Sequence, residues 1–233
     1  MALFAIGDLH FSGSPPSKPM DKFGDNWTNH REIIAAHWQE EVKPEDTVIL
    51  CGDTSWSLEL PDAIEKDFTF ISSLPGQKVL LKGNHDYWWT GVTKMANAVE
   101  HKFLFLHNNF IPVGNLAVCG TRGWNLPSMS TFTEHDAAMY SREGQRLEHS
   151  LSQALAAGYT RILVALHYPP LYKAEEDTVF TELCRQYKVE KCIYGHVHGK
   201  AAQALNMFQG EKNGTDYRLV AADFLDFKLK KLE

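Results

Sequence analysis

The sequence has no long hydrophobic run, no clustered cysteines and no surplus of positive charge. No segment approaches the roughly 18 apolar residues that a membrane-spanning helix requires, and the N-terminus lacks the basic start of a secretory signal. The four cysteines form no C-x-x-C pair, which is typical of proteins from a reducing compartment. We therefore expect an uncleaved cytoplasmic protein without a membrane partner.

Length and charge limit the organisation and the partners. With 233 residues and 44% hydrophobic content, the chain can bury one sizeable core, which favours a single domain over residues 1–233. The formal net charge of −6 disfavours a broad basic face for DNA or RNA. A small anionic substrate is compatible with this charge, because a short basic patch or bound metal ions can supply positive charge locally.

Short β-rich segments alternate with helical patterns, which predicts an α/β protein. The spacing of Ile64, Phe68 and Ile71 indicates an amphipathic helix, and Thr133 with Asp136 resembles a capping box before a second one. Residues 12–27, rich in Pro, Gly and Ser, predict a functional loop close to the active site. The predicted strands are 3–6, 47–50, 78–81, 102–106, 116–119, 161–166, 191–194, 203–208 and 217–222, with the last two forming a hairpin.

Five of these apolar runs end in residues that commonly bind metals. Because the carboxyl ends of parallel strands open onto one crevice, residues far apart in the sequence can meet there. In Asp8-x-His10 and His196-x-His198, the i, i+2 spacing puts both side chains on one face of an extended chain. The residues that follow the five runs are Asp8 and His10, Asp53, Asn84 with His85 and Asp86, His167, and His196 with His198.

Two carboxylates, one amide oxygen and four imidazoles form a mixed oxygen and nitrogen donor set. Such a set suits zinc, manganese or iron better than calcium. Seven donors exceed the needs of one tetrahedral ion, and two ions that share a carboxylate are a common arrangement for cleaving phosphate esters. Asp53, which stands alone after Gly52, is the candidate for the shared carboxylate.

The ordered set D-x-H, G-D, G-N-H-D, H and G-H-x-H, from Asp8 to His198, resembles the calcineurin-like metallophosphoesterase superfamily. The segments GDTSW, GNHDYWW, CGTRGW and LHYPP are similar to its uncharacterised bacterial branch of predicted phosphohydrolases. The resemblance implies a four-layer α/β/β/α sandwich of two mixed sheets flanked by helices. It also implies two metal ions, the first held by Asp8, His10 and His198, the second by Asn84, His167 and His196, and both by Asp53.

The resemblance further implies a phosphohydrolase in which a metal-bridging hydroxide attacks a phosphomonoester or phosphodiester directly. His85 would then donate a proton to the leaving group, and Asp86 would orient His85. Arg122 is either a phosphate clamp or part of a structural salt bridge. The partner that we expect is a small phosphorylated molecule, while the metal identities and the oligomeric state stay open.

Two alternatives share the same motifs. A nuclease acting on a nucleic-acid polymer would use the same metal chemistry, although the acidic net charge disfavours it. A non-catalytic protein-binding scaffold of the same fold is disfavoured because no expected ligand and no proton donor is missing. The aromatic run from Tyr87 to Trp89 fits either core packing or a stacking platform for a substrate.

Overall fold

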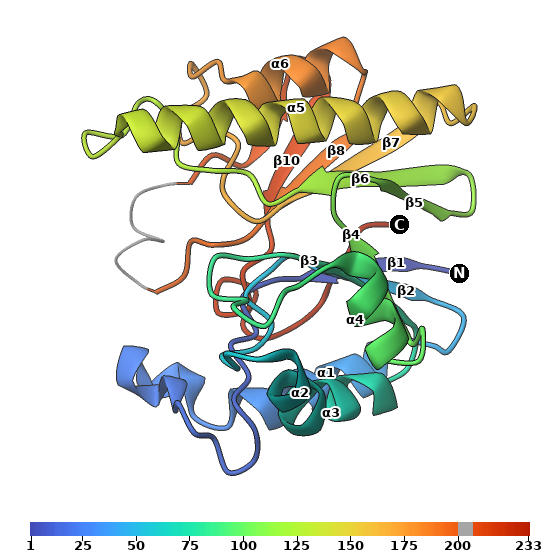
Figure 1. Ribbon diagram of the computed structural model, residues 1–233, viewed down its shortest axis with the longest axis vertical. Helices are drawn as coiled ribbons and strands as arrows, with labels where there is room; N and C mark the ends of the chain where they lie inside the picture. The colour runs from blue at the N-terminus through green and yellow to red at the C-terminus, as the bar shows by residue number, and fades with distance from the viewer. Residues whose placement is uncertain (200–206) are drawn as a thin grey trace.

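The computed structural model describes residues 1–199 and 207–233, which form two packed β-sheets with helices on both outer faces (Figure 1). The strand order is β11-β1-β2-β3-β4 in the first sheet and β5-β6-β7-β8-β10-β9 in the second. Helices α1, α2 and α3 cover the first sheet, and α5 and α6 cover the second (Figure 1). This arrangement is the α/β/β/α sandwich that the resemblance implies.

The first sheet has a parallel centre and one antiparallel edge. Strands β1 and β2 are buried along their whole length, which is why their sequences are nearly continuous apolar runs. Pairing of β1 with the antiparallel β11 makes the sheet mixed, as expected. The strands are β1 (Leu3–Ile6), β2 (Thr47–Leu50), β3 (Gln77–Leu81), β4 (Phe103–Leu106) and β11 (Lys230–Lys231).

The second sheet is also mixed, with β6, β7, β8 and β10 parallel and both edge strands antiparallel. Its strands are β5 (Phe110–Val113), β6 (Leu116–Thr121), β7 (Arg161–Leu166), β8 (Lys191–Tyr194), β9 (Gly210–Lys212) and β10 (Thr215–Leu219).

The closing hairpin differs from the prediction. Most of the predicted strand 203–208 lies outside the described residues. The observed hairpin pairs β9 with β10 around Asn213 and Gly214, inside the segment that was expected to be its loop. Asn-Gly favours such a tight two-residue turn, because both positions adopt positive φ angles, 53° and 83° here.

The helices follow local signals where those signals are strong. At the start of α5, the backbone N–H of Asp136 donates to the Thr133 hydroxyl at 3.2 Å, and the Thr133 N–H donates to the Asp136 carboxylate at 2.9 Å. This is the predicted capping box. A π-helical turn joins α2 to α3 within the predicted helix that contains Ile64, Phe68 and Ile71. The helices are α1 (His30–Glu41), α2 (Leu60–Ala63), α3 (Thr69–Ser73), α4 (Val92–Ala98), α5 (Glu134–Ala156) and α6 (Val179–Gln186).

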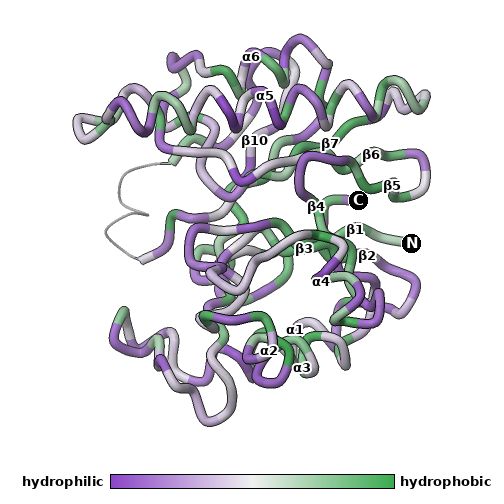
Figure 2. Tube along the Cα trace, viewed as in Figure 1, coloured by the Kyte–Doolittle hydropathy of each residue, from purple (hydrophilic) through white to green (hydrophobic). Residues whose placement is uncertain are grey.

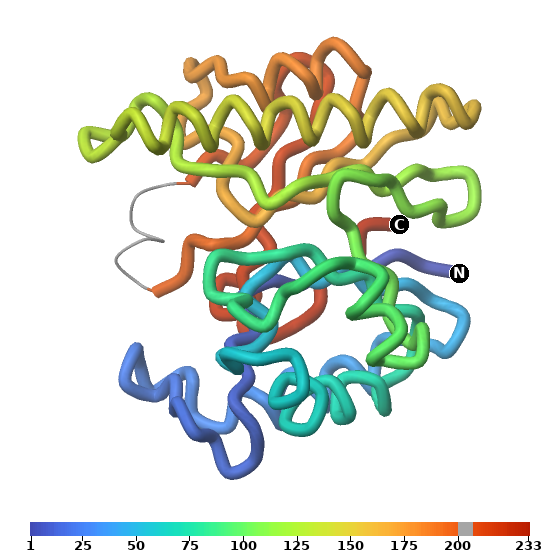
Figure 3. Tube along the Cα trace, viewed as in Figure 1, coloured from blue at the N-terminus to red at the C-terminus, as the bar shows by residue number. Residues whose placement is uncertain are grey.

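The core has three layers, and the middle one joins the two halves of the molecule. Leu3, Ile49 and Val79 of the first sheet pack with Val118 and Leu163 of the second. Figure 2 shows these apolar strands inside, with polar residues distributed over the outer helices. Figure 3 shows that the first half of the chain builds one side of the sandwich and most of the second half builds the other. None of the described helices combines the length and the hydropathy of a membrane span.

Candidate metal centre

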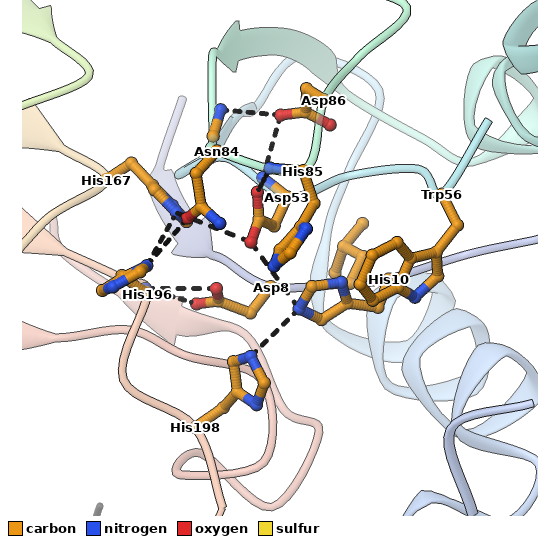
Figure 4. A network of polar contacts seen from close by, with 12 residues as sticks. Asp8, His10, Asp53, Trp56, Asn84, His85, Asp86, His167, His196 and His198 are labelled. Carbon is orange, nitrogen blue, oxygen red and sulfur yellow. Dashed lines mark hydrogen bonds and ion pairs between the residues drawn. The ribbon is translucent and has the colours of Figure 1, made fainter. Parts of the chain in front are cut away.

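The residues that follow β1, β2, β3, β7 and β8 meet at one edge of the sandwich. Figure 4 shows their side chains pointing toward one another from both sheets. One candidate donor from each of Asp8, His10 and His198 lies within 4.8 Å of the other two, and the same holds for Asp8, Asp53 and His167. Between the first sheet and the second, Nε2 of His10 lies 3.2 Å from Nε2 of His198. The predicted convergence of distant strand ends is therefore present.

A second group of donors brings together Asn84, His167 and His196. Oδ1 of Asn84 lies 2.7 Å from Nε2 of His167 and 2.8 Å from Nδ1 of His196. The two imidazole nitrogens are 3.2 Å apart. Nδ1 of His167 donates to the carbonyl oxygen of Cys51 at 2.9 Å, so the lone pair of this ring is on Nε2 and faces the cluster. Three electron-pair donors thus converge on one point.

Asp53 lies between the two groups. Its Oδ2 is 3.8 Å from Nε2 of His10 and 3.5 Å from Nε2 of His167, so it approaches one imidazole of each group. Its Oδ1 accepts the backbone N–H of His85 at 2.7 Å, which fixes the carboxylate. A carboxylate in this position has the geometry that a shared ligand requires.

Four of the candidate ligands have left-handed backbone conformations. The φ angles of Asp8, His10, Asp53 and His196 are 56°, 48°, 51° and 72°. Side-chain-bearing residues rarely adopt such angles, and surrounding structure must hold them. Backbone hydrogen bonds beyond the strand ends do so here, from Asp8 to Gly52 at 3.0 Å and from His10 to Asp53 at 2.9 Å.

Two glycines allow the loops to approach closely. A Cβ atom on Gly83 would lie 2.1 Å from Oδ1 of Asp53, and one on Gly52 would lie 2.5 Å from Nδ1 of His167. Both distances are far below van der Waals contact. The glycine that precedes the polar residues is therefore required for the donors to meet, as the sequence pattern indicates.

Burial shifts the pKa values of the donors toward their neutral forms. It raises the pKa of Asp8 well above its usual value, with repulsion by Asp53 adding to the effect, and it raises the pKa of Asp53 to about 6. It lowers the pKa of His167 to about 3, and those of His10 and His196 also fall. Neutral imidazoles and carboxylates in need of a counter-charge are the donors that a transition-metal cation favours, so the residues fit such an ion.

Comparison with protein families assigns the chain. The model of the calcineurin-like phosphoesterases matches residues 1–200, which include every residue of the cluster. The chain belongs to this family. A comparison with curated proteins gives no match.

Comparison with solved structures finds similar chains, the first of which supports the fold. A protein of unknown function from Aquifex aeolicus is 18% identical, with a TM-score of 0.50 over 99% of this chain and 95% of its own. The calcineurin-like phosphoesterase YfkN from Bacillus subtilis is 13% identical, with a TM-score of 0.49 over 94% and 80%. The sulfate thiohydrolase SoxB from Thermus thermophilus is 13% identical, with a TM-score of 0.44 over 94% and 51%.

Within this phosphoesterase fold, Asp86 does not have the partner expected from the sequence. The predicted hydrogen bond from His85 is absent, because five other N–H groups occupy both carboxylate oxygens. Asp86 therefore links the loop after β2 to the loop after β3 and holds the backbone of Asp53 in place. Its donors are the backbone N–H groups of Asp53, Thr54, Ser55 and Gly83 and the indole N–H of Trp88, at 2.7 to 3.3 Å.

His85 lies beside the cluster, and its ring forms no hydrogen bond with Asp86. Its ring centre is 4.5 Å from that of Trp56 and 5.8 Å from that of His10. Its Nδ1 is buried and has no hydrogen-bond partner among the residues that the structure describes. The role of proton donor stays a prediction, and packing against Trp56 positions the ring instead of a carboxylate.

Arg122 lies on the second sheet, directly after β6. Its guanidinium is 4.3 Å from the ring centre of Trp124 and forms no ion pair within residues 1–199 and 207–233. The alternative of a structural salt bridge is therefore not supported there. Its carbonyl oxygen accepts the N–H of His167 at 3.0 Å, which places Arg122 next to a candidate ligand.

The aromatic run after Asp86 has two different environments. Trp88 and Trp89 are buried in the core, whereas Tyr87 is 57% exposed. The loop over residues 12–27 approaches the site at Trp27, whose ring is 6.2 Å from that of His10 and 6.0 Å from that of His198. Core packing thus explains both tryptophans of the run.

Sequence reasoning missed two residues of the site. Trp56 stacks on His10 with ring centres 4.8 Å apart, and the segment GDTSW contains it without indicating a role for it. Asp223 is buried, and its Oδ2 accepts the N–H of Gly199, next to His198, at 2.6 Å. Its Oδ1 has no hydrogen-bond partner in the described part of the chain. Asp223 ends the apolar run 217–222, so the rule that identified the other five strand ends also points to it.

Proposed function

We propose that the chain is a dinuclear metal-dependent phosphohydrolase that cleaves phosphomonoesters or phosphodiesters by direct attack of water. The position of Asp53 supports this most strongly, because one of its oxygens lies within 4 Å of an imidazole from each donor group. A carboxylate between two sets of donors is the arrangement that two ions ~3.5–4 Å apart require. Family membership supports the same type of chemistry.

Each residue has a role in this proposal. Asp8, His10 and His198 would hold one ion and Asn84, His167 and His196 the other, with Asp53 shared. The donor types favour manganese, iron or zinc. Bound there, the ions would supply charge neutralisation at the phosphate and a lowered pKa for a water molecule.

The proton balance involves His85. The attacking water loses one proton to solvent. As the bond from its oxygen to phosphorus forms, the bond to the leaving oxygen breaks, and protonated His85 gives its proton to that oxygen and takes up another from solvent. The guanidinium of Arg122 holds a non-bridging phosphate oxygen through its planar fork. The backbone bonds around Asp53 keep the donors in place before substrate binds, so little reorganisation is needed during reaction.

The partner would be a small phosphorylated molecule, and the site of action the cytoplasm. All four cysteines are buried and unpaired, which supports a reducing compartment.

The test is hydrolysis of an aryl phosphate and a bis-aryl phosphate by the purified chain, before and after metal removal. We expect two ions per chain, loss of turnover with a chelator and recovery on adding manganese, iron or zinc. Asp62→Asn, an exposed aspartate on α2, is the matched control and should behave as the wild type. Chelator-resistant turnover would contradict the proposal. Two bound ions without turnover of either ester or of single-stranded DNA would favour the scaffold alternative.

A further inference from the structure

Four basic side chains gather at the carboxyl ends of β3, β4 and β6, outside the candidate ligands. Lys82 directly follows β3, His107 follows β4 and Arg122 follows β6, while Arg146 belongs to α5. Leu81 and Leu106 are paired in register, so Lys82 and His107 take neighbouring positions at the same edge of the sheet. These four residues are termed the basic cluster.

Among the described residues, the basic cluster has one acidic partner at ion-pair distance. Glu143 is fully buried, forms an ion pair with Arg146 at 2.6 Å and accepts the hydroxyl of Thr121. The charged ends of Lys82 and Arg122 have no ion pair or hydrogen bond in residues 1–199 and 207–233, although both residues are half-buried. Among the described residues, Arg146 is thus the only one of the three Lys and Arg side chains with an ion pair, and the carboxylates of Asp86 and Asp53 act on Lys82 and Arg122 only from beyond ion-pair distance.

The cluster adjoins the metal centre. Lys82 immediately precedes Gly83 and Asn84 in sequence, and the carbonyl of Arg122 is bonded to the N–H of His167. Leu106, which ends β4 and pairs with Leu81 of β3, also lies against Gly120 of β6, where a Cβ atom would be 2.8 Å from its Cδ2. Lys82, His107 and Arg122 therefore follow neighbouring strand ends.

We propose that the basic cluster binds a second phosphate group, so that the preferred substrate carries one phosphate at the metal centre and another against Lys82, with the guanidinium of Arg122 between the two. This rests on the proposed function. Half-buried cations without partners are costly, and an anion that binds between them removes that cost. A guanidinium fork beside an ammonium group suits phosphate oxygens. A substrate with a single phosphate group would leave Lys82 without an anionic partner.

The chemistry of a second phosphate has two sources, a diphosphate ester and a bisphosphate with the groups on different carbons. The experiment compares kcat/KM for a nucleoside monophosphate, the matching nucleoside diphosphate and the matching 3′,5′-bisphosphate. We expect one of the last two to exceed the monophosphate by about tenfold or more, because hydrogen bonds to charged groups are strong. Which of them does so identifies the source. Equal values for all three would overturn the proposal.

The variants test the residues. The preference is the ratio of kcat/KM for the substrate with two phosphates to kcat/KM for the monophosphate. Lys82→Gln should reduce this ratio toward one, and Lys82→Arg should restore it. Lys102→Gln, which changes an exposed lysine paired with Glu100, should leave the ratio unchanged. A Lys82→Gln enzyme with the wild-type preference would contradict the assignment.

Binding separates this inference from the proposed function. Calorimetric titration of pyrophosphate into the chain with a chelator present needs neither metal nor turnover. We expect Lys82→Gln to bind pyrophosphate about tenfold more weakly than the wild type and Lys102→Gln to bind equally well. Pyrophosphate binding that depends on Lys82, without hydrolysis of any ester, would leave this inference standing and remove the proposed function. Equal binding by Lys82→Gln would overturn the inference.

Discussion

The two sheets bring different chemistry to the candidate metal centre. The loops after β1, β2 and β3 contribute every oxygen donor, from Asp8, Asp53 and Asn84, together with His10 (Figure 4). The second sheet contributes only imidazoles, from His167, His196 and His198. Neither sheet has a complete donor set, so the site depends on the apolar layer that packs the sheets together. Metal affinity and the packing of the two halves should therefore be coupled.

The halves also differ in how their loops are held. Three of the four ligands with positive φ lie on the first sheet, where backbone bonds and Asp86 fix them. On the second sheet, the loop that carries His198 is held by Asp223, through the N–H of Gly199. The other two imidazoles of this sheet are held from the first sheet or from β6, because His167 bonds the carbonyl groups of Cys51 and Arg122 and the N–H of His196 donates to the carboxylate of Asp8.

Asp53→Asn should have the largest effect, because Asp53 is the residue that approaches imidazoles of both groups. We expect metal content to fall below two ions and turnover to fall by more than the ~10²-fold typical of residues that only support ligands. Metal analysis and kcat/KM on an aryl phosphate measure both. A variant with two ions and the wild-type rate would mean that the sheets do not share a ligand.

His85→Ala should act on the rate and not on the metals. Removal of a proton donor costs ~10²–10⁴-fold, and the loss should be greater for an alkyl phosphate than for p-nitrophenyl phosphate, whose leaving group needs no proton. His149→Ala, an exposed histidine on α5, is the control. Equal losses on both esters would contradict the role of His85.

Asp86→Asn should loosen the first sheet's loops. An amide keeps one acceptor oxygen, so at least two of the N–H donors lose their partner. We expect the free energy of unfolding to fall by about 1.5–3 kcal/mol, measured by chemical denaturation. The alkaline side of the plot of kcat/KM against pH should not move, because Asp86 forms no hydrogen bond with the ring of His85. A shift of the alkaline side of that plot, with unchanged stability, would support the hydrogen bond between His85 and Asp86 that was expected from the sequence.

Asp223→Asn should weaken the second sheet's side of the site. The amide keeps the bond to Gly199 but removes a negative charge that counteracts the effect of burial on the pKa of His198. We expect manganese affinity to fall about tenfold, measured by electron paramagnetic resonance. Asp226→Asn, an exposed neighbour, should bind as the wild type. Equal affinities in all three proteins would make Asp223 a structural residue only.

The smallest expected effect is that of pH on metal affinity. The pKa of Asp53 is raised from 3.8 to about 6 in the folded protein. The protonated carboxyl group therefore stabilises the metal-free fold below pH 3.8, and this stabilisation is lost as the pH rises through 6. Metal binding must displace that proton at low pH. We expect affinity at pH 5.5 to be about fourfold lower than at pH 7.5 from Asp53 alone. Manganese should accordingly raise the melting temperature more at pH 7.5, and an equal rise would contradict this.

Strand positions and strand-end motifs were accessible from the sequence because both are local. Residues 3–6, 47–50, 161–166 and 191–194 were predicted with the observed bounds, since continuous apolar runs bounded by polar residues mark buried strands. The short helices α4 and α6 and the edge strands β5, β9 and β11 were not predicted, because elements of two to eight residues depend on tertiary contacts.

The errors at the site have the same origin. Asp86 was paired with its sequence neighbour His85, whereas most of its donors come from the loop after β2, more than 30 residues earlier. The basic cluster depends on the position of α5 beside β6, which no local pattern encodes. Strand order, and with it the proximity of Asp223 to His198, is likewise a property of the assembled sheets.

The division of donors between the two sheets also has a consequence for synthesis on the ribosome. Asn84 and His167 are separated by 83 residues. At ~5–20 residues per second, their emergence is separated by roughly 4–17 s. During that interval the nascent first half has oxygen donors and one imidazole but lacks the remaining three, and the inner face of its sheet is uncovered. Stable metal capture must therefore follow translation of β7 and β8, which protects the growing chain from retaining an ion in an incomplete site.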